Sequence, residues 1–251
     1  MLSDHATPKS ACAIVLAGGR GKRISHLYPD LPKPMVPAAG EPFIEWVLQH
    51  LAAQGVRRAL VSVGYLAEVV ERYLARRPSD GLEASAVRET QPLGTGGAAR
   101  LAAQAAAAER LVVVNGDSLV LADLRTAWTL LNREELDGVV VGVEMDDTAR
   151  YGTLIVGAGK RLAGFREKRP GSGLINAGVY FFKRPLIDAL PLGTPMSLES
   201  DLFPAWLAGG ANFSVLAVRA PFLDIGTPTS VREAEGFIRE HFAAAVTKLA
   251  A

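Results

Sequence analysis

The stretch Leu16-Ala-Gly-Gly-Arg-Gly-Lys-Arg-Ile24 follows an apolar run, residues 11–17, that is typical of a buried strand. Its three glycines let the backbone approach a ligand closely and adopt positive φ at little steric cost. Four cations surround this glycine loop: Arg20, Lys22, Arg23 and, a few residues later, Lys33. Backbone amides and cations together hold phosphate. The stretch therefore predicts a phosphate-binding loop at the end of the first strand.

Two common phosphate-binding motifs do not fit this loop. A P-loop needs a glycine where Leu16 stands and a Ser or Thr where Arg23 stands. The dinucleotide fingerprint needs Gly or Ala at the position of Ile24. A turn with solvated charges is the alternative interpretation, but the density of glycines and cations favours phosphate binding.

The composition is that of a globular protein and excludes several classes. The 251 residues, 49% of them hydrophobic, suffice for one large domain or two lobes that share a sheet. The net charge of +1 gives no basic field for nucleic acid. Cys12 is the single cysteine, which excludes an intrachain disulfide and favours a buried structural thiol. Neither a signal peptide nor a membrane-length apolar run is found, so a cytoplasmic protein is expected.

Strand-like and helix-like segments alternate along the first half of the chain, which predicts a parallel α/β sheet. After the first strand, the expected strands are 59–63, 82–88 and 111–115, and the expected helices are 42–54, 66–76 and 97–108. Short turns then separate four further runs, which predicts antiparallel additions to the same sheet. These runs are 139–145, 153–156, 162–167 and 174–182, followed by a helix at 198–207, a strand at 212–218 and a last helix after Thr227-Pro228. The predicted organisation is a tail at 1–10 and one domain at 11–251, with halves of about 11–115 and about 116–251.

Two aspartates occupy positions where a hard cation can bind. Asp117, in Asn115-Gly-Asp117, lies just past the carboxyl end of the fourth strand, where open α/β sheets bind ligands. Asp224 lies between a short strand and a helix start. Each aspartate alone is also explained as a turn or cap residue. Together, the two carboxylates can share one or two metal ions.

Further motifs offer groups for a base, a ribose and a sugar phosphate. Glu89-Thr-Gln-Pro-Leu-Gly-Thr-Gly-Gly97 is a second glycine loop, which can press its backbone against a base or ribose, although a simple turn is the alternative. Glu167 can accept hydrogen bonds from hydroxyls, Lys168 can neutralise a phosphate and Asn176 can bond a hydroxyl. An isolated Glu-Lys pair is more often a solvated surface pair.

In this order the motifs resemble those of the sugar-1-phosphate nucleotidylyltransferases, over roughly residues 12–235. The shared motifs are Gly18 to Arg23, Pro32-Lys33-Pro34, Gly116-Asp117, Glu167-Lys168, Asn176-Ala-Gly178 and Asp224. Within that family the chain is most similar to the D-glycero-α-D-manno-heptose 1-phosphate guanylyltransferases. This similarity lies in Pro32 to Pro37, Pro92 to Gly97, Arg150 to Thr153, Gly173 to Gly178 and Asp224 to Pro228. Mannose-1-phosphate guanylyltransferases and a muramic acid uridylyltransferase are similar but less close. Lys22 departs from the family pattern, which has Thr there.

The resemblance implies a fold and a site. The fold is the Rossmann-like nucleotide-diphospho-sugar transferase fold, an α/β fold with a mixed, mostly parallel sheet flanked by helices. The implied catalytic residues are Arg23, Lys33 and Asp117, with Mg²⁺ held by Asp117 and Asp224. The implied nucleotide-binding residues are Leu16, Ala17, Gly18, Gly19, Gly21, Lys22, Arg23, Glu89, Gly94, Thr95, Asn115 and Asp117. The implied sugar-phosphate-binding residues are Tyr151, Gly152, Glu167, Lys168, Asn176 and Gly178.

The implied reaction is attack of a sugar 1-phosphate on the α-phosphorus of a nucleoside triphosphate, with release of pyrophosphate. GTP and D-glycero-α-D-manno-heptose 1-phosphate are the expected substrates, and mannose 1-phosphate or another hexose 1-phosphate is the alternative. A glycosyltransferase of the same fold or a non-catalytic nucleotide-sugar-binding module are alternatives of a different class. No nucleic acid or membrane partner is expected, and the oligomeric state and the pathway stay open.

Overall fold

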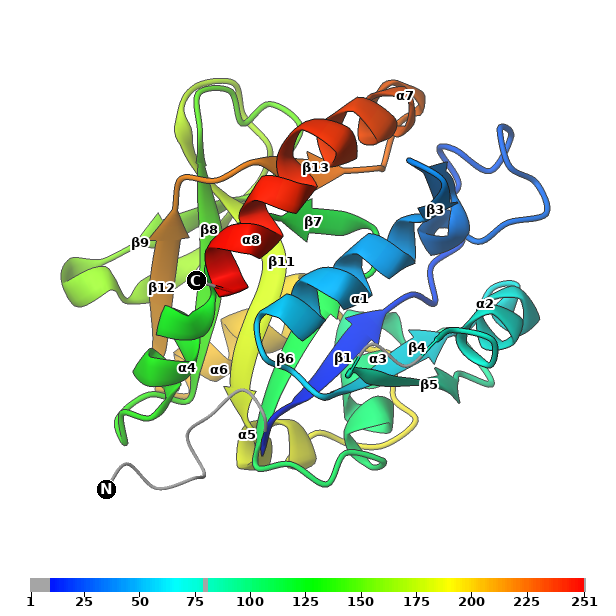
Figure 1. Ribbon diagram of the computed structural model, residues 1–251. Helices are drawn as coiled ribbons and strands as arrows, with labels where there is room; N and C mark the ends of the chain where they lie inside the picture. The colour runs from blue at the N-terminus through cyan, green and yellow to red at the C-terminus, as the bar shows by residue number, and fades with distance from the viewer. Residues whose placement is uncertain (1–9, 79–80, 251) are drawn as a thin grey trace.

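The computed structural model describes residues 10–78 and 81–250, so all but the last residue of the predicted tail at 1–10 lies outside the described residues. A nine-stranded sheet forms the centre of the molecule (Figure 1). Its parallel part has the order β5-β4-β1-β6. These strands are β1 (Cys12–Leu16), β4 (Arg58–Val63), β5 (Glu83–Arg88) and β6 (Arg110–Asn115). The alternation of strands and helices in the sequence predicts this parallel part.

The second half of the chain extends this sheet with strands of mixed direction. The long strand β11 (Gly173–Lys183) runs antiparallel to β6 on one side and to β8 (Gly138–Met145) on the other. Two further antiparallel strands are β9 (Thr153–Val156) and β10 (Leu162–Arg166). Strand β12 (Phe213–Val218) then pairs with β8 in parallel. The predicted mixed α/β fold with antiparallel additions is confirmed.

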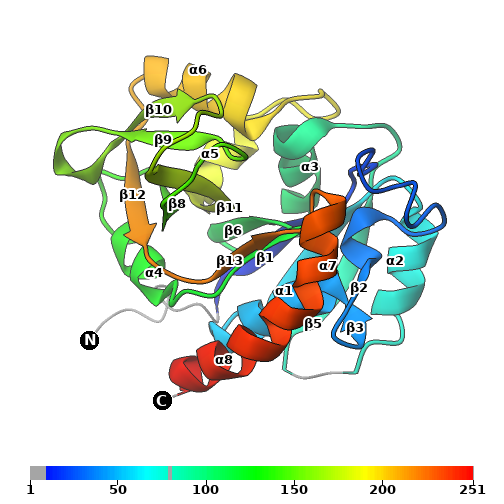
Figure 2. The same ribbon diagram turned by 90° about the horizontal axis from the view of Figure 1, so that it is seen from above.

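Helices cover both faces of the sheet, as the view from above shows (Figure 2). Along β1, Ala13 and Val15 join the apolar cluster on one face, whereas Cys12 and Ile14 join the cluster on the other. The helices of the first face are α1 (Phe43–Ala53), α2 (Ala67–Leu74), α4 (Arg125–Leu131), α7 (Pro228–Phe237) and α8 (Ala243–Ala250). Those of the other face are α3 (Gly94–Ala103), α5 (Arg184–Asp188) and α6 (Phe203–Ala208). Strands buried on both faces read as continuous apolar runs, and β1 does so.

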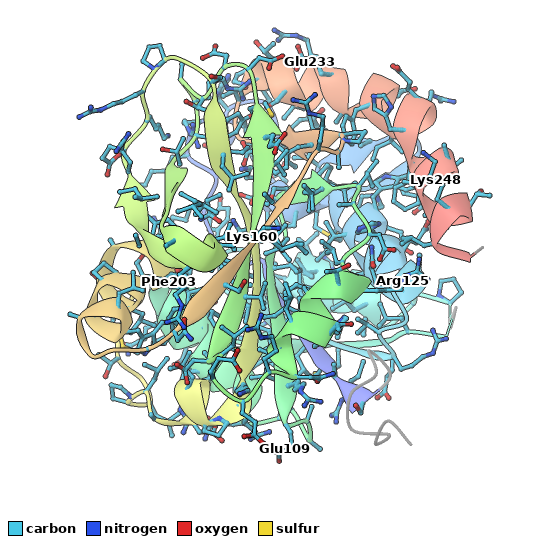
Figure 3. The ribbon with its side chains drawn as sticks, turned by 90° about the vertical axis from the view of Figure 1, so that its left-hand side faces the viewer. Glu109, Arg125, Lys160, Phe203, Glu233 and Lys248 are labelled. Carbon is cyan, nitrogen blue, oxygen red and sulfur yellow. The ribbon has the colours of Figure 1, made fainter. Side chains whose placement is uncertain are left out.

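Aromatic rings fill the core between α6 and the second half of the sheet. Phe203, labelled in Figure 3, packs against the rings of Tyr180, Phe182 and Phe213 with centroid distances of 5.4, 6.0 and 5.1 Å. Burying each such side chain contributes about 1.5–3 kcal/mol. On β1, burial raises the pKa of the Cys12 thiol to about 11, so this cysteine is an unreactive core residue, as expected.

Several elements differ from the sequence prediction. Helix α3 begins at Gly94 instead of residue 97 and ends at Ala103 instead of residue 108. Helices α4 and α5 are too short to show a clear period in the sequence, and they were not predicted. The sequence prediction has no strand directly after Asp117, but strand β7 (Ser118–Val120) begins there. The remaining strands are β2 (Pro37–Ala38), β3 (Glu41–Pro42) and β13 (Phe222–Asp224).

Candidate active site

The loops that follow the parallel strands meet at one edge of the sheet and line a cleft. The cleft has a volume of about 800 Å³ and adjoins a smaller hollow of about 210 Å³. Of the predicted nucleotide-binding residues, the larger cleft is lined by Leu16, Gly18, Gly19, Gly21, Lys22, Glu89, Gly94, Thr95, Asn115 and Asp117. The smaller hollow adds Ala17, Arg23 and Lys33. Parallel strands that end at a common edge explain why these distant segments converge.

The glycine loop wraps tightly around Lys33. Gly21 has φ +56°, a conformation that favours glycine, and a Cβ there would lie 2.9 Å from the Cβ of Lys33. The carbonyl of Gly21 then accepts hydrogen bonds from the amides of Ile24 and Ser25 at 2.9 and 3.1 Å. The loop is therefore a compact turn whose shape fixes the stem of the lysine.

Lys33 lies between the two predicted metal ligands. Its Nζ donates a hydrogen bond to Oδ2 of Asp117 at 2.6 Å and lies 3.7 Å from Oδ2 of Asp224. The lysine is buried, whereas the two carboxylates are partly accessible, with side chains 31% and 26% exposed. A buried ammonium with paired carboxylates is compensated, and the accessible carboxylates stay open to a ligand.

A short ladder brings these two carboxylates together from distant parts of the chain. Strands β7 and β13 pair in antiparallel register, with Asp224 opposite Ser118 (Figure 1). The amide of Ile225 donates to the carbonyl of Asp117 at 3.0 Å. Oδ1 of Asp224 accepts from the amide of Gly226 at 2.8 Å, which leaves Oδ2 on the side of Lys33. Arg23 also lies beside Gly226, so the charged groups of Arg23, Lys33 and Asp224 surround this glycine.

The donor set fits a magnesium ion held together with phosphate oxygens. Mg²⁺ binds through one or two carboxylates plus substrate phosphates, and a carboxylate pair around a cation is present here, with the Lys33 ammonium as the cation. Within the described residues no group of three or more His, Cys, Asp or Glu side chains is placed to hold a metal. A metal bound here would therefore need ligand oxygens in addition to Asp117 and Asp224.

The second glycine loop has a different geometry from the one expected. Its glycines lie in the first turn of α3 and pack against the chain's own backbone: a Cβ on Gly94 would lie 2.5 Å from the carbonyl of Met196, and one on Gly97 would lie 2.5 Å from that of Thr194. Gly97, which the sequence prediction does not assign to a ligand, lines neither hollow. Gly94 and Thr95 do line the larger cleft.

Glu89 forms part of the cleft wall and also braces it. Its carboxylate accepts hydrogen bonds from Ser62 Oγ at 2.9 Å and from the amide of Leu93 at 3.1 Å. A side chain on Gly18 would collide with this carboxylate, so the glycine is needed for the close contact between β1's loop and β5's loop. The carboxylate keeps further acceptor sites, because an ionised carboxyl accepts about four hydrogen bonds.

Four of the predicted sugar-phosphate-binding residues, Tyr151, Gly152, Asn176 and Gly178, are linked along the chain and by hydrogen bonds. Burial raises the pKa of the Tyr151 hydroxyl, and the carboxylate of Asp224 adds to this rise while Arg150 opposes it. Gly152 accepts a backbone hydrogen bond from Asn176 at 2.9 Å, and the Asn176 side chain accepts one from the amide of Gly178 at 3.1 Å. Arg150 closes the group by donating to Thr227 Oγ1, at the start of α7, at 3.2 Å.

The other two residues of this predicted set stand apart. Glu167 and Lys168 follow β10 and are exposed. None of the six predicted residues lines the cleft or the smaller hollow, and no hydrogen bond or ion pair joins the side chain of Glu167 or Lys168 to the described part of the chain. Their assignment to the sugar phosphate stays a prediction.

The residues of this site lie within a long stretch of chain that matches a known protein family. Residues 12–241 match the profile of the nucleotidyl transferase family. The chain belongs to this family. A D-glycero-α-D-manno-heptose 1-phosphate guanylyltransferase of Aneurinibacillus thermoaerophilus is 34% identical over 89% of this chain and 96% of its own length. A mannose-1-phosphate guanylyltransferase of Mycobacterium tuberculosis is 35% identical over 90% of this chain and 62% of its own length.

A solved structure shares the fold at similar identity. The structure of HddC from Yersinia pseudotuberculosis in complex with GMP-PN matches this nucleotidyltransferase with a TM-score of 0.80 and 31% identity, over 90% of this chain and 98% of that chain. This agreement confirms the predicted Rossmann-like fold. In the described part of the chain, no helix is long and apolar enough to cross a bilayer.

Sequence reasoning missed part of the cleft wall. Outside the predicted loops, the larger cleft is lined by Gly64, Tyr65, Leu66 and Ala98, and the two predicted glycine loops contribute Arg20, Thr90, Gln91 and Pro92 as well. The guanidinium of Arg20 lies 5.8 Å from the centre of the Tyr65 ring, and Leu66 adopts the left-handed conformation at φ 50°. A signal for Gly64 and Tyr65 existed, because they follow the expected strand at 59–63 at the ligand-binding edge.

Proposed function

We propose that this nucleotidyltransferase joins a sugar 1-phosphate to the nucleotidyl group of a nucleoside triphosphate and releases pyrophosphate. The best substrate pair is GTP with D-glycero-α-D-manno-heptose 1-phosphate, giving GDP-heptose. The observation that carries the proposal is the Lys33 ammonium held between Asp117 and Asp224 under the cationic glycine loop. The names of the relative from Aneurinibacillus thermoaerophilus and of the HddC complex with GMP-PN support the guanine nucleotide and, for the first, the heptose.

The proposed chemistry needs positioning and neutralisation of charge more than proton transfer, because the phosphate nucleophile is already anionic. A phosphate oxygen of the sugar 1-phosphate attacks the α-phosphorus, a new O–P bond forms, and the bond from the α-phosphorus to the bridging oxygen breaks. Lys33 neutralises charge on the α-phosphate and the nucleophile. Arg23 and the amides of the glycine loop stabilise the departing pyrophosphate.

Asp117 and Asp224 are the residues that would hold magnesium in this proposal. When bound there, Mg²⁺ supplies electrophilic stabilisation of the phosphate oxygens. Beside these carboxylates, the Lys33 ammonium has further N–H donors that it can offer to a phosphate. Glu89, Gly94 and Thr95 are assigned to the base and ribose, and Asn115 to the nucleotide. Tyr151, Gly152, Glu167, Lys168, Asn176 and Gly178 are assigned to the sugar phosphate.

A mannose-1-phosphate guanylyltransferase is the second candidate, since the relative from Mycobacterium tuberculosis is 35% identical to this chain. A glycosyltransferase is less well supported, because the Asp-x-Asp typical of such metal sites is absent at Asp117-Ser-Leu119. A cytoplasmic location stays a prediction, as do the oligomeric state and the pathway.

Pyrophosphate release tests this proposal. The protein is incubated with Mg²⁺, each of the four common nucleoside triphosphates in turn, and heptose, mannose or glucose 1-phosphate. Turnover should be highest with GTP and the heptose 1-phosphate, should need both substrates and should stop when EDTA removes divalent metal. Faster turnover with mannose 1-phosphate would favour the second candidate, whereas no turnover with any pair would overturn the proposal.

A further inference from the structure

A chain of hydrogen bonds runs behind the cleft, from the first turn of α3 to strand β11. At its centre, the hydroxyl of Tyr180 donates to Oε1 of Glu199 at 2.7 Å. Glu199 belongs to a single π-helical turn, Leu198–Leu202, and lines neither the cleft nor the smaller hollow. Tyr180 is fully buried in β11. Neither residue belongs to the predicted site, yet each contacts a residue that does.

On the nucleotide side, this chain of hydrogen bonds ends at Thr95. Its hydroxyl donates to Oε2 of Glu199 at 3.3 Å and accepts from the amide of Leu198 at 2.7 Å. Ser197 Oγ donates to the same carboxylate oxygen at 3.2 Å. Thr95 also lines the larger cleft. Glu199 therefore touches the back of a cleft residue that the proposed function assigns to the nucleotide.

On the sugar side, the chain of hydrogen bonds ends at Asn176. Its Nδ2 donates to the hydroxyl of Tyr180 at 2.7 Å, and its Oδ1 accepts from the amide of Gly178 at 3.1 Å. The two ends of the carboxamide are thereby distinguished, because Nδ2 only donates and Oδ1 only accepts. One Nδ2 hydrogen and one acceptor site of Oδ1 stay available to a ligand. The orientation of Asn176 thus depends on Tyr180.

The direction of these bonds is fixed by chemistry. An ionised carboxylate only accepts, so Glu199 requires donors from both Tyr180 and Thr95. Burial and the neighbouring Glu199 raise the pKa of Tyr180 well above its ordinary value, which keeps its hydroxyl protonated as the donor. The close packing of Gly94 and Gly97 against the backbone at Met196 and Thr194 holds the two segments at a fixed separation. The hydrogen-bond chain therefore joins rigid elements.

We propose that Tyr180 and Glu199 are positioning residues that couple the nucleotide wall at Thr95 to the sugar-binding side chain of Asn176. The proposal rests on the proposed function for the identity of the two ligands. A shift of Thr95 when nucleotide binds is transmitted to Asn176. The carboxamide of Asn176 is then oriented correctly for the sugar 1-phosphate. Loss of the Tyr180 hydroxyl leaves Asn176 without its orienting partner and leaves Glu199 with one donor fewer.

The chain offers a closely matched control. Tyr73 donates its hydroxyl to Oε2 of Glu45 at 2.7 Å, the same kind of tyrosine–glutamate bond at the same length, but between α2 and α1. Neither Tyr73 nor Glu45 lines the cleft. Y73F therefore reports the general cost of deleting a tyrosine hydroxyl that bonds a glutamate, whereas Y180F reports that cost plus any positioning effect.

The first experiment uses the ligand-free protein and backbone amide hydrogen exchange. T95V removes the hydroxyl, and T95S keeps it. T95V should speed exchange by about tenfold at Leu198, its direct partner, and by about threefold at Gly178, at the far end of the chain of bonds. T95S should leave both amides near wild type. In the Y180F background, T95V should no longer affect Gly178. An unchanged Gly178 amide in T95V would overturn the coupling.

The second experiment measures steady-state kinetics of pyrophosphate release. Y180F should raise KM for the sugar 1-phosphate about tenfold, because the loss of one buried hydrogen bond changes a binding equilibrium by roughly tenfold. The kcat value should stay within about threefold of wild type. Y73F should leave that KM unchanged. E199A should have a larger effect than E199Q, whose carboxamide oxygen still accepts from Tyr180.

The outcomes separate this inference from the proposed function. If wild type turns over and Y180F leaves the sugar KM as unchanged as Y73F does, the positioning role is overturned and the proposed function stands. If wild type releases no pyrophosphate with any substrate pair, the proposed function fails, and the exchange experiment on the ligand-free protein still decides the coupling.

Discussion

Two charged regions of this molecule have the same kind of residues and opposite degrees of order. Lys33, Asp117 and Asp224 form contacts of 2.6 and 3.7 Å in a partly buried position and are fixed by the β7–β13 ladder. Glu167 and Lys168 are exposed on the loop after β10 and have no side-chain hydrogen bond or ion pair with the described residues. Charges that are already arranged need little reorganisation when charge develops at a reacting phosphate. If the exposed pair binds the sugar phosphate as proposed, that ligand must order the two side chains, which costs about 0.5–1.5 kcal/mol per side chain.

The largest expected effect comes from breaking the ordered cluster. Asp117→Asn should lower kcat for pyrophosphate release by about 10³-fold, because a preorganised charge at the reacting phosphate is lost. The thermal midpoint should change little, since the side chain is partly exposed. D123N is the matched control, as Asp123 is an exposed aspartate that pairs with Arg125. A D117N enzyme with normal turnover would remove Asp117 from the catalytic assignment.

The second effect is a loss of folding stability at acid pH, caused by a buried histidine packed against the segment that follows β7. His50 of α1 and Gln54, which follows the end of this helix, lie against the segment after β7. Gln54 donates to the carbonyl of Ala122 at 2.7 Å and accepts from the amide of Leu124 at 3.0 Å. Burial lowers the pKa of His50 from 6.5 to about 4. Between these pH values the unfolded chain binds the proton more strongly, so stability is complete above about pH 6.5 and falls by about 3 kcal/mol as the pH approaches about 4.

Urea unfolding at pH 7.5, 5.5 and 4.5 measures this loss. His50→Leu should flatten the slope contributed by this residue, whereas the same substitution at exposed His26 should not. Equal slopes in wild type and H50L would show that His50 is not the titrating group.

A smaller effect is expected from the exposed pair. Lys168→Ala should raise KM for the sugar 1-phosphate about tenfold, with little change in kcat or in thermal midpoint, because the lysine is assigned to the sugar phosphate and its side chain bonds no described residue. Lys248→Ala, at an exposed lysine of α8 (Figure 3), is the control and should change neither constant. A large loss of stability in K168A would mean that the loop after β10 is more ordered than its exposure indicates.

The smallest effect tests the departure in the glycine loop. Lys22 is exposed and lines both hollows. Lys22→Thr should raise KM for the nucleotide about threefold at low salt, and the difference should shrink at high salt because exposed charges are screened. Arg20→Thr, two residues earlier in the loop, gives a comparison at a second cationic residue of the cleft. A lower KM in K22T would mean that the hydroxyl contributes more to binding than the ammonium does.

The parts of the fold that follow from local sequence could be predicted, and the parts that depend on distant contacts could not. Strand β1 and its glycine loop follow from an apolar run and three glycines within a few residues. The start of α3 does not, because Gly94, Gly96 and Gly97 are poor helix formers and are held by the segment around Met196. Strands β7 and β13 have three residues each, too few to show a period.

The site shows the same division. The loops at the ends of parallel strands could be placed together from the edge rule alone, and all predicted nucleotide-binding residues line the cleft or the adjoining hollow. The packing of Tyr180 and Glu199 behind Thr95 and Asn176 could not, because it depends on how β11 and the turn at 198–202 meet in space. Residue identity revealed the groups that touch ligands but not the groups that orient them.

The pairing of β7 with β13 also sets the order in which the parts of the site become available during synthesis. The ribosome makes the chain from its N-terminus, and the strands of the central sheet all precede Asp224 in the sequence. Asp224 can join Asp117 beside Lys33 only after residues 222–224 have left the ribosome. A chain stalled before that point would lack one of the two carboxylates that the proposed function assigns to the metal.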